Sequence, residues 1–115
     1  MKLEPEDLER AQNEASSERE LTELLARQYG VPAIDLSTRT ISSEVVMLVP
    51  NDVRLRLLAV PVERHGSVLV VAFADPSNFA AVTELEELTQ MDIEIVVSCE
   101  TAVRSAIARL QSAGP

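Results

Sequence analysis

The residues of this 115-residue chain that could do chemistry are few, and they form no catalytic pattern. The chain has one histidine, His65, and one cysteine, Cys99. Metal sites and catalytic triads need several such groups together, and a single histidine beside Gly66 is typical of an exposed turn. Cys99 follows a predicted strand, where a small apolar residue is usually buried. We therefore predict no catalytic residue, no metal site and no cofactor.

Two further sets of polar residues are best explained by a structural role. Glu84, Glu86 and Glu87 fall on the predicted outer face of a helix, which favours a solvated surface over a metal site. Asp75-Pro76-Ser77-Asn78 reads as a strand end followed by a helix cap, although a binding loop at the end of a strand is the alternative. With three glycines and no Gly-x-x-x-x-Gly-Lys-Ser/Thr loop, the chain is not expected to hydrolyse ATP.

Composition limits the classes of partner and compartment. The net charge is -9, which argues against binding to nucleic acid and to anionic membrane surfaces. Hydrophobic residues make up 46% of the chain but aromatic residues only 3%, so the core must be aliphatic. One cysteine permits no intrachain disulfide and fits a reducing compartment. No apolar run approaches the length of a membrane span, so we predict a cytoplasmic protein without direct membrane insertion.

The strongest structural signal is a pair of strands. The run Val68–Ala74 is almost continuously apolar, as expected of a central strand covered on both faces. It follows a strand from Val60, with a tight turn at His65-Gly66. A helix then follows, with its inner face predicted at Phe79, Val82, Leu85 and Leu88, and after it a strand over Asp92–Ser98 and a helix over Ala102–Ser112.

Before the strand pair the pattern is helical. Residues 1–16 are predicted to be a flexible or weakly helical arm, and residues 17–115 a single domain. A helix over Ser17–Tyr29 begins with a capping-box spacing, and its buried face includes Leu21, Leu24 and Leu25. An extended connector over Val31–Thr40 comes next. A short helix capped by Ser42 or Ser43 and a second helix over Asn51–Leu58 follow this connector, and the second is expected to point Arg54 and Arg56 outward.

The fold class that follows is α+β. N-terminal helices precede a β-β-α-β-α unit, and the right-handed crossover makes the third strand parallel to one strand of the pair. The result is a small three-stranded mixed sheet covered by helices. A fourth strand at Ile34–Leu36 is an open alternative.

Five short sequence segments, in a fixed order along the chain, resemble those of a known family. They are Leu25-Ala26-Arg27-Gln28-Tyr29-Gly30-Val31-Pro32, Asp35-Leu36, Leu48-Val49-Pro50, Ala59-Val60-Pro61-Val62 and Val71-Ala72-Phe73-Ala74-Asp75-Pro76. Over residues 18–112 the chain is similar to the N-terminal domain of type II secretion and type IV pilus assembly ATPases. One departure is Met91, at a position where relatives commonly carry glycine in the turn before the third strand.

The resemblance implies a non-catalytic docking domain. Its partners would be the cytoplasmic domain of an inner-membrane platform protein and an ATPase domain further along the same chain, so the protein would be held at the inner membrane through its partner. The residues we assign to partner binding are Leu21, Leu24, Leu25, Arg54 and Arg56. Some relatives bind cyclic di-GMP through Arg-Leu-Gly motifs, which this chain lacks. Sensing of cyclic di-GMP or another small anion is therefore the second hypothesis.

Overall fold

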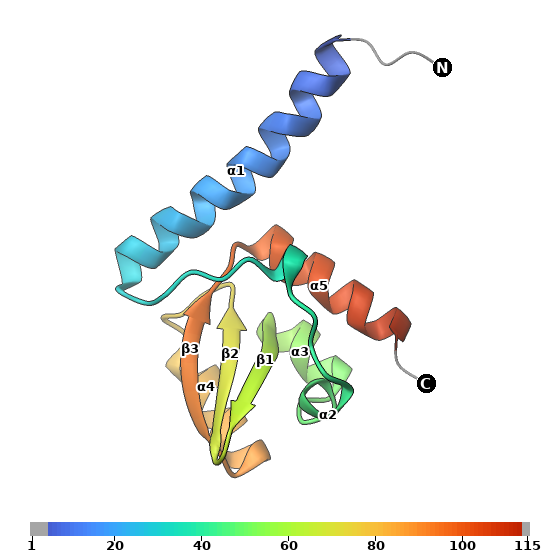
Figure 1. Cartoon of the computed structure of the whole chain (residues 1–115). Coiled ribbons are helices and arrows are strands. Elements are labelled where there is room, and N and C mark those ends of the chain that lie inside the picture. The colour runs from blue at the N-terminus through green and yellow to red at the C-terminus, as the bar shows by residue number, and fades with distance from the viewer. Residues whose placement is uncertain (1–4, 114–115) are drawn as a thin grey trace.

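The computed structural model describes the backbone of residues 5–113 and the side chains of residues 17–110. The elements follow in the order α1 (Pro5–Tyr29), the 3-10 helix η1 (Leu36–Thr38), α2 (Ser43–Val46), α3 (Asn51–Leu57), β1 (Ala59–His65), β2 (Val68–Phe73), α4 (Phe79–Thr89), β3 (Asp92–Val97) and α5 (Glu100–Ala113) (Figure 1). This order confirms the predicted α+β class and its β-β-α-β-α unit.

The three strands form one mixed sheet in the order β1-β2-β3. β1 and β2 form an antiparallel hairpin, whose turn contains Gly66 with a φ of 60°. α4 then carries the chain over to β3, which pairs parallel to β2. The register of β1 shifts between Pro61 and Glu63, and Pro61 lacks the N–H that a regular ladder would use. Because β2 pairs with β1 on one side and with β3 on the other, it is the central strand, as its apolar run predicted.

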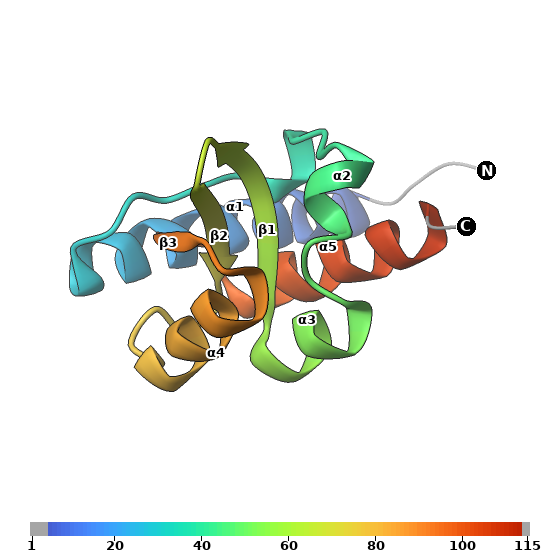
Figure 2. The same ribbon diagram turned by 90° about the horizontal axis from the view of Figure 1, so that it is seen from below.

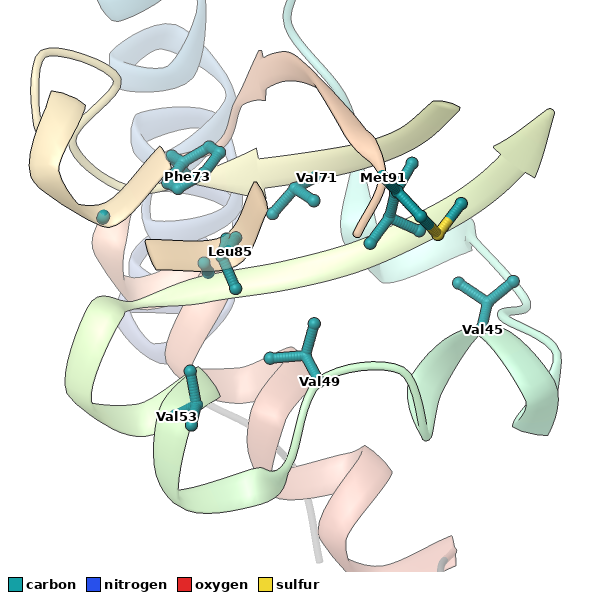
Figure 3. Close-up of a cluster of buried hydrophobic side chains, with 10 residues drawn as sticks. Val45, Val49, Val53, Val71, Phe73, Leu85 and Met91 are labelled. Atoms are coloured by element: carbon teal, nitrogen blue, oxygen red, sulfur yellow. The ribbon is translucent and has the colours of Figure 1, made fainter. Parts of the chain in front are cut away.

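Helices cover both faces of the sheet, and a separate hydrophobic cluster lies on each face. One cluster joins β2 to α2, α3 and α4, and its members include Val45, Val49, Val53, Val71, Phe73, Leu85 and Met91 (Figure 3). The other joins the opposite side of the strands to η1 and α5, and includes Leu36, Val60, Val70, Val103, Ala106 and Ile107. Figure 2 shows α4 and α3 on the near side of the sheet and α5 on the far side. Most core side chains of the described residues are aliphatic and Phe73 is the one aromatic ring among them, as the composition predicted.

The helix boundaries have identifiable causes. Ser42 caps α2, since its hydroxyl accepts from the Val45 N–H, and Asn78 caps α4 by accepting from the Ala81 N–H. Gln90 ends α4 in the left-handed conformation, with a φ of 57°. The left-handed turn before β3 is thus made by Gln90, and Met91 contributes a buried side chain to the core instead.

The N-terminal region differs from the prediction at Ser17, which we expected to begin a helix. α1 is one continuous helix from Pro5 to Tyr29, so Ser17 lies inside it and caps nothing. Residues 5–16, which we predicted to be a flexible or weakly helical arm, form the first half of this helix. Residues 1–4 lie outside the described residues, and the division at residue 17 stays a prediction. The open alternative of a fourth strand at Ile34–Leu36 is not realised, and the sheet has three strands. The connector makes a single parallel bridge, Ala33 to Val97, and then turns into η1.

In α3 and α4, three side chains lie on a different side of their helix from the one predicted. Arg54 of α3 is buried, although we expected it to point outward with Arg56. Phe79 and Leu88 of α4 are exposed, although we assigned both to its buried face. The buried positions of α4 are Ala81 and Leu85, one turn apart, which leaves Phe79 in the first turn on another side of the helix.

Candidate functional site

The candidate partner residues of α1 form a partly exposed apolar stripe. Leu21 is 47% exposed and Leu24 59% exposed, while Leu25 is half-buried. We predicted that all three would mark the buried face. The structure instead leaves two of these leucines on the surface, beside Tyr29 in the last turn of the same helix. Exposed leucines one turn apart offer the kind of apolar surface that partner proteins cover.

α1 is anchored to the rest of the fold by its second half. The buried Thr22 Oγ1 accepts a hydrogen bond of 3.0 Å from the Cys99 backbone N–H, at the start of α5. The helix ends at Gly30, which has a φ of 67°, and the connector then pairs with β3 through Val97 N–H to Pro32 O, 2.9 Å. In Figure 1 the first half of α1 extends away from the sheet, so the leucine stripe lies near the anchored end.

A cleft of about 410 Å³ lies between α1, the connector and the start of α5. Residues from all three segments line it: Glu18, Arg19, Thr22, Glu23, Ala33, Ile34, Asp35, Ser37, Ser98 and Ala102. Three of these side chains are carboxylates and one is a guanidinium. The cleft is therefore more suited to polar or cationic groups than to anions.

Asp35 is held at one edge of this cleft. The backbone N–H and the hydroxyl of Ser37 both donate to Asp35 Oδ1. These bonds lower the pKa of the Asp35 carboxyl, and the charges of Arg19 and Arg109 act in the same direction. Arg109 of α5 also donates to the backbone carbonyl of Leu36, at 2.8 Å. The connector is thus fastened to α5 as well as to β3.

Arg56 is exposed, as predicted, but it is already paired within the molecule. Its guanidinium donates to both carboxylate oxygens of Glu84 in α4, with 3.0 Å between Nη1 and Oε1. These bonds, donated by Arg56, raise the pKa of the Arg56 guanidinium and lower the pKa of the Glu84 carboxyl. Arg56 therefore joins α3 to α4, and a partner would have to compete with Glu84 for it.

The predicted partner residues do not form one surface. α1 contacts β3, at one edge of the sheet, whereas α3 contacts β1 at the other edge. The leucines of α1 and the arginines of α3 are therefore separated by the width of the sheet. Sequence spacing could not show this, because it depends on which edge strand each helix joins.

The residues weighed for catalysis are not brought together. His65 is exposed at the hairpin turn and lies within 3.2 Å of Glu63, while Cys99 is fully buried. Among the described residues, no three His, Cys, Asp or Glu side chains are grouped so that they could hold a metal ion. Nor does any helix in the described part of the chain have the length and apolar character that crossing a membrane requires.

Two proteins similar in sequence to this chain are type IV pilus assembly ATPases. Over 95 residues the chain is 46% identical to the type IV pilus assembly ATPase PilB of Myxococcus xanthus, an alignment that covers 83% of this chain. It is 27% identical over 95 residues to PilB of Thermus thermophilus. The chain spans about 17% and 11% of the length of these two proteins.

Solved structures share the fold. A structure of MshE with bound cyclic di-GMP is 30% identical, superposes with a TM-score of 0.72, and covers 81% of this chain and 68% of its own. The N-terminal domain of XpsE, at 22% identity and a TM-score of 0.66, covers 93% of this chain and 86% of its own, and supports the fold alone. The MshEN domain profile matches residues 29–115. The chain therefore belongs to the MshEN domain family, the N-terminal domain of type II secretion and type IV pilus assembly ATPases.

Proposed function

We propose that this chain is a non-catalytic docking domain that couples an ATPase motor to the cytoplasmic domain of an inner-membrane platform protein. The observation that carries the proposal is the pair of exposed leucines, Leu21 and Leu24, on a helix anchored to a rigid sheet. The protein would act in the cytoplasm and reach the inner membrane through this partner. The motor would be an ATPase domain elsewhere in the same polypeptide.

The chemistry of the described residues supports a binding role. His65 and Cys99 lie apart from each other, and neither lines the cleft. The carboxylates of the cleft therefore have no histidine or thiol beside them with which to form a catalytic group. An apolar stripe beside acidic side chains is instead suited to a protein surface that combines apolar and basic groups. Leu21 and Leu24 would form the apolar centre of the contact, and Glu18 and Glu23 would lie at its rim.

We expect the double substitution Leu21→Asp and Leu24→Asp to weaken binding to the platform protein about tenfold or more, because it places two charges in an apolar contact. Isothermal titration calorimetry with the purified cytoplasmic domain of the platform protein measures this. Circular dichroism checks the fold, which should be unchanged because both side chains are largely exposed.

Met47→Asp is the matched control for this experiment. Met47 is 73% exposed at the end of α2, and α2 contacts β1 rather than the edge strand that α1 joins. The control should therefore bind like the wild type. The docking function is wrong if the wild-type domain shows no binding at about 100 μM. The assignment of the surface is wrong if the double variant binds as well as the control.

Sensing of cyclic di-GMP is the second candidate, because the structure of MshE that shares this fold contains that ligand. Two features of this chain oppose it. The chain has no Arg-Leu-Gly motif, and its cleft carries Glu18, Glu23 and Asp35 against one cation, Arg19. Carboxylates repel the two phosphates of a cyclic dinucleotide.

A thermal-shift titration separates the two candidates. A ligand that binds only the folded domain must raise the melting temperature as its concentration rises. We expect cyclic di-GMP to leave the melting temperature unchanged, because of the charge of the cleft. A rise that grows with cyclic di-GMP and is absent with GMP at the same ionic strength would establish the sensing function.

A further inference from the structure

β3 is an edge strand whose outer side is only partly used. The strand order β1-β2-β3 leaves one side of β3 without a neighbouring strand. The connector pairs with this side at Val97, whose N–H donates to the Pro32 carbonyl at 2.9 Å and whose carbonyl accepts from the Ile34 N–H at 3.0 Å. In Figure 1 β3 is the outermost strand, and α1 and the connector lie at its carboxyl end. Within the described part of the chain, residues 92–95 have no strand on this side.

The backbone groups on the open side belong to Ile93 and Ile95. In a strand the N–H and C=O of one residue point to the same side, and this side alternates from residue to residue. The Asp92 N–H donates to the Ser67 carbonyl, just before β2, whereas both backbone groups of Val97 bond to the connector. Even-numbered residues of β3 therefore face β2, and odd-numbered residues face outward. The N–H and C=O of Ile93 and Ile95 are thus two donors and two acceptors without a partner among the described residues.

The other edge of the sheet is protected in ways that β3 is not. β1 contains Pro61 and a register shift between Pro61 and Glu63, and α2, α3 and α5 all contact it. β3 contains no proline, and its pairing with β2 is regular along its whole length. α4 packs on one face of β3 and α1 reaches its carboxyl end, but neither supplies a strand. Unpaired backbone groups on a regular edge strand can hydrogen-bond to an added extended segment.

The side chains of β3 indicate which segment fits. Ile93 and Ile95 are half-buried and pack against the cluster that α4 covers. Asp92 and Glu94 alternate with them, so their exposed carboxylates lie on the other face. Neither carboxylate has an ion pair or a hydrogen bond among the described residues. An added strand places its side chains beside those of β3 on the same face, so basic residues suit the carboxylates and aliphatic residues suit the isoleucines.

We propose that the open edge of β3 binds an extended segment of a partner protein in which basic and β-branched aliphatic residues alternate. The segment forms a fourth strand, with hydrogen bonds to the N–H and C=O of Ile93 and Ile95. A second copy of the chain is the wrong occupant, because pairing of two β3 edges places Asp92 and Glu94 beside the same carboxylates of the other copy. The proposal rests on the docking function and deepens it by naming the chemistry of the partner segment.

The test is a nuclear magnetic resonance titration of the 115-residue chain with the peptide acetyl-Lys-Val-Lys-Val-Lys-Val-amide. One control, acetyl-Glu-Val-Glu-Val-Glu-Val-amide, keeps the alternation and reverses the charge. A second, acetyl-Lys-Lys-Lys-Val-Val-Val-amide, keeps the composition and loses the alternation. We expect a saturable shift of the Ile93 and Ile95 N–H signals with a Kd of about 1 mM or tighter for the first peptide. The two controls should bind at least about fivefold more weakly.

Amide hydrogen exchange separates strand pairing from simple attraction between charges. In the free chain the N–H groups of Ile93 and Ile95 lack an acceptor, so they should exchange faster than the Glu94 N–H, which faces β2. A peptide concentration that occupies about nine-tenths of the sites should slow exchange at both isoleucines about tenfold. Exchange at Glu94 should stay the same, because its N–H is already paired.

A charge reversal on the strand tests the chemistry of the segment. Glu94→Lys should weaken binding of the alternating lysine peptide about fivefold or more and strengthen binding of the alternating glutamate peptide. Glu44→Lys is the matched control, since it makes the same change of net charge at an exposed residue of α2, which contacts β1 at the other edge of the sheet. The control variant should bind like the wild type.

Four results would overturn the proposal. The first three are no saturable shift at Ile93 and Ile95 up to about 10 mM peptide, equal binding of either control peptide, and fast exchange at both isoleucines when the peptide is bound. The fourth is slow exchange without peptide that depends on protein concentration, which would show that a second copy occupies the edge. Because the probe is a peptide, these outcomes are independent of calorimetry with the platform protein, which tests the docking function itself.

Discussion

Replacing Phe73 by alanine should lower the free energy of unfolding by about 3–5 kcal/mol, the largest effect that we expect from a single substitution in this domain. Phe73 ends the central strand β2 and is 1% exposed, in the cluster that α3 and α4 cover. The substitution removes the only aromatic ring among the buried side chains of the described residues, and leaves a cavity. Because small domains are stable by about 5–15 kcal/mol, this loss leaves a marginal fold. Urea denaturation measures it as a lower midpoint.

Phe79→Ala is the matched control for Phe73→Ala. It deletes the same ring from a residue that is 70% exposed in the first turn of α4. We expect a change within about 0.5 kcal/mol, because little apolar surface leaves water at this position. If both substitutions cost the same, or if Phe73→Ala costs less than about 1 kcal/mol, Phe73 is not the centre of the core.

Thr22→Val should destabilise the domain by about 1–3 kcal/mol, because it leaves the buried N–H of Cys99 without an acceptor. Valine has nearly the shape of threonine, so the substitution removes the hydroxyl and little else. The bond it breaks joins residues 77 positions apart in the chain and holds α1 at the start of α5. Urea denaturation reports the loss of stability, and amide hydrogen exchange should become faster at Cys99.

Thr83→Val is the control for the buried hydroxyl. Thr83 Oγ1 donates to the Phe79 carbonyl within the exposed part of α4, at 3.1 Å. In the valine variant, water can donate to the Phe79 carbonyl in place of the hydroxyl, so we expect the free energy of unfolding to change by no more than about 0.5 kcal/mol. Equal effects of the two threonine substitutions, or unchanged exchange at Cys99 in Thr22→Val, would show that the hydroxyl of Thr22 does not anchor α1.

Much of the fold could be predicted from local patterns. The apolar run of β2, the glycine at the hairpin turn and the Asp75-Pro76 stop are signals contained in a few neighbouring residues. The helix caps at Ser42 and Asn78 are equally local. These local features determine the order of the elements and the central position of β2. They also determine which apolar side chains of the strands and helices must be covered.

The parts that could not be predicted depend on contacts between distant segments. A stripe of leucines at helical spacing looks the same whether it is covered or not, and only the packing of α1 on β3 leaves Leu21 and Leu24 exposed. Likewise, periodicity placed Arg54 on the outside of α3, because it assumes that a helix is covered on one side. α3 contacts both β1 and α5, so two of its sides are covered and Arg54 is enclosed.

The amino-acid sequence by itself thus determined the α+β class, the composition of the core and the absence of a phosphate-binding loop, since each follows from neighbouring residues or from residue counts. Only the tertiary structure decided which apolar and charged side chains remain available to a partner. Availability depends on what lies above a side chain, and that is set by residues far away in the chain, as the bond between Thr22 and Cys99 illustrates.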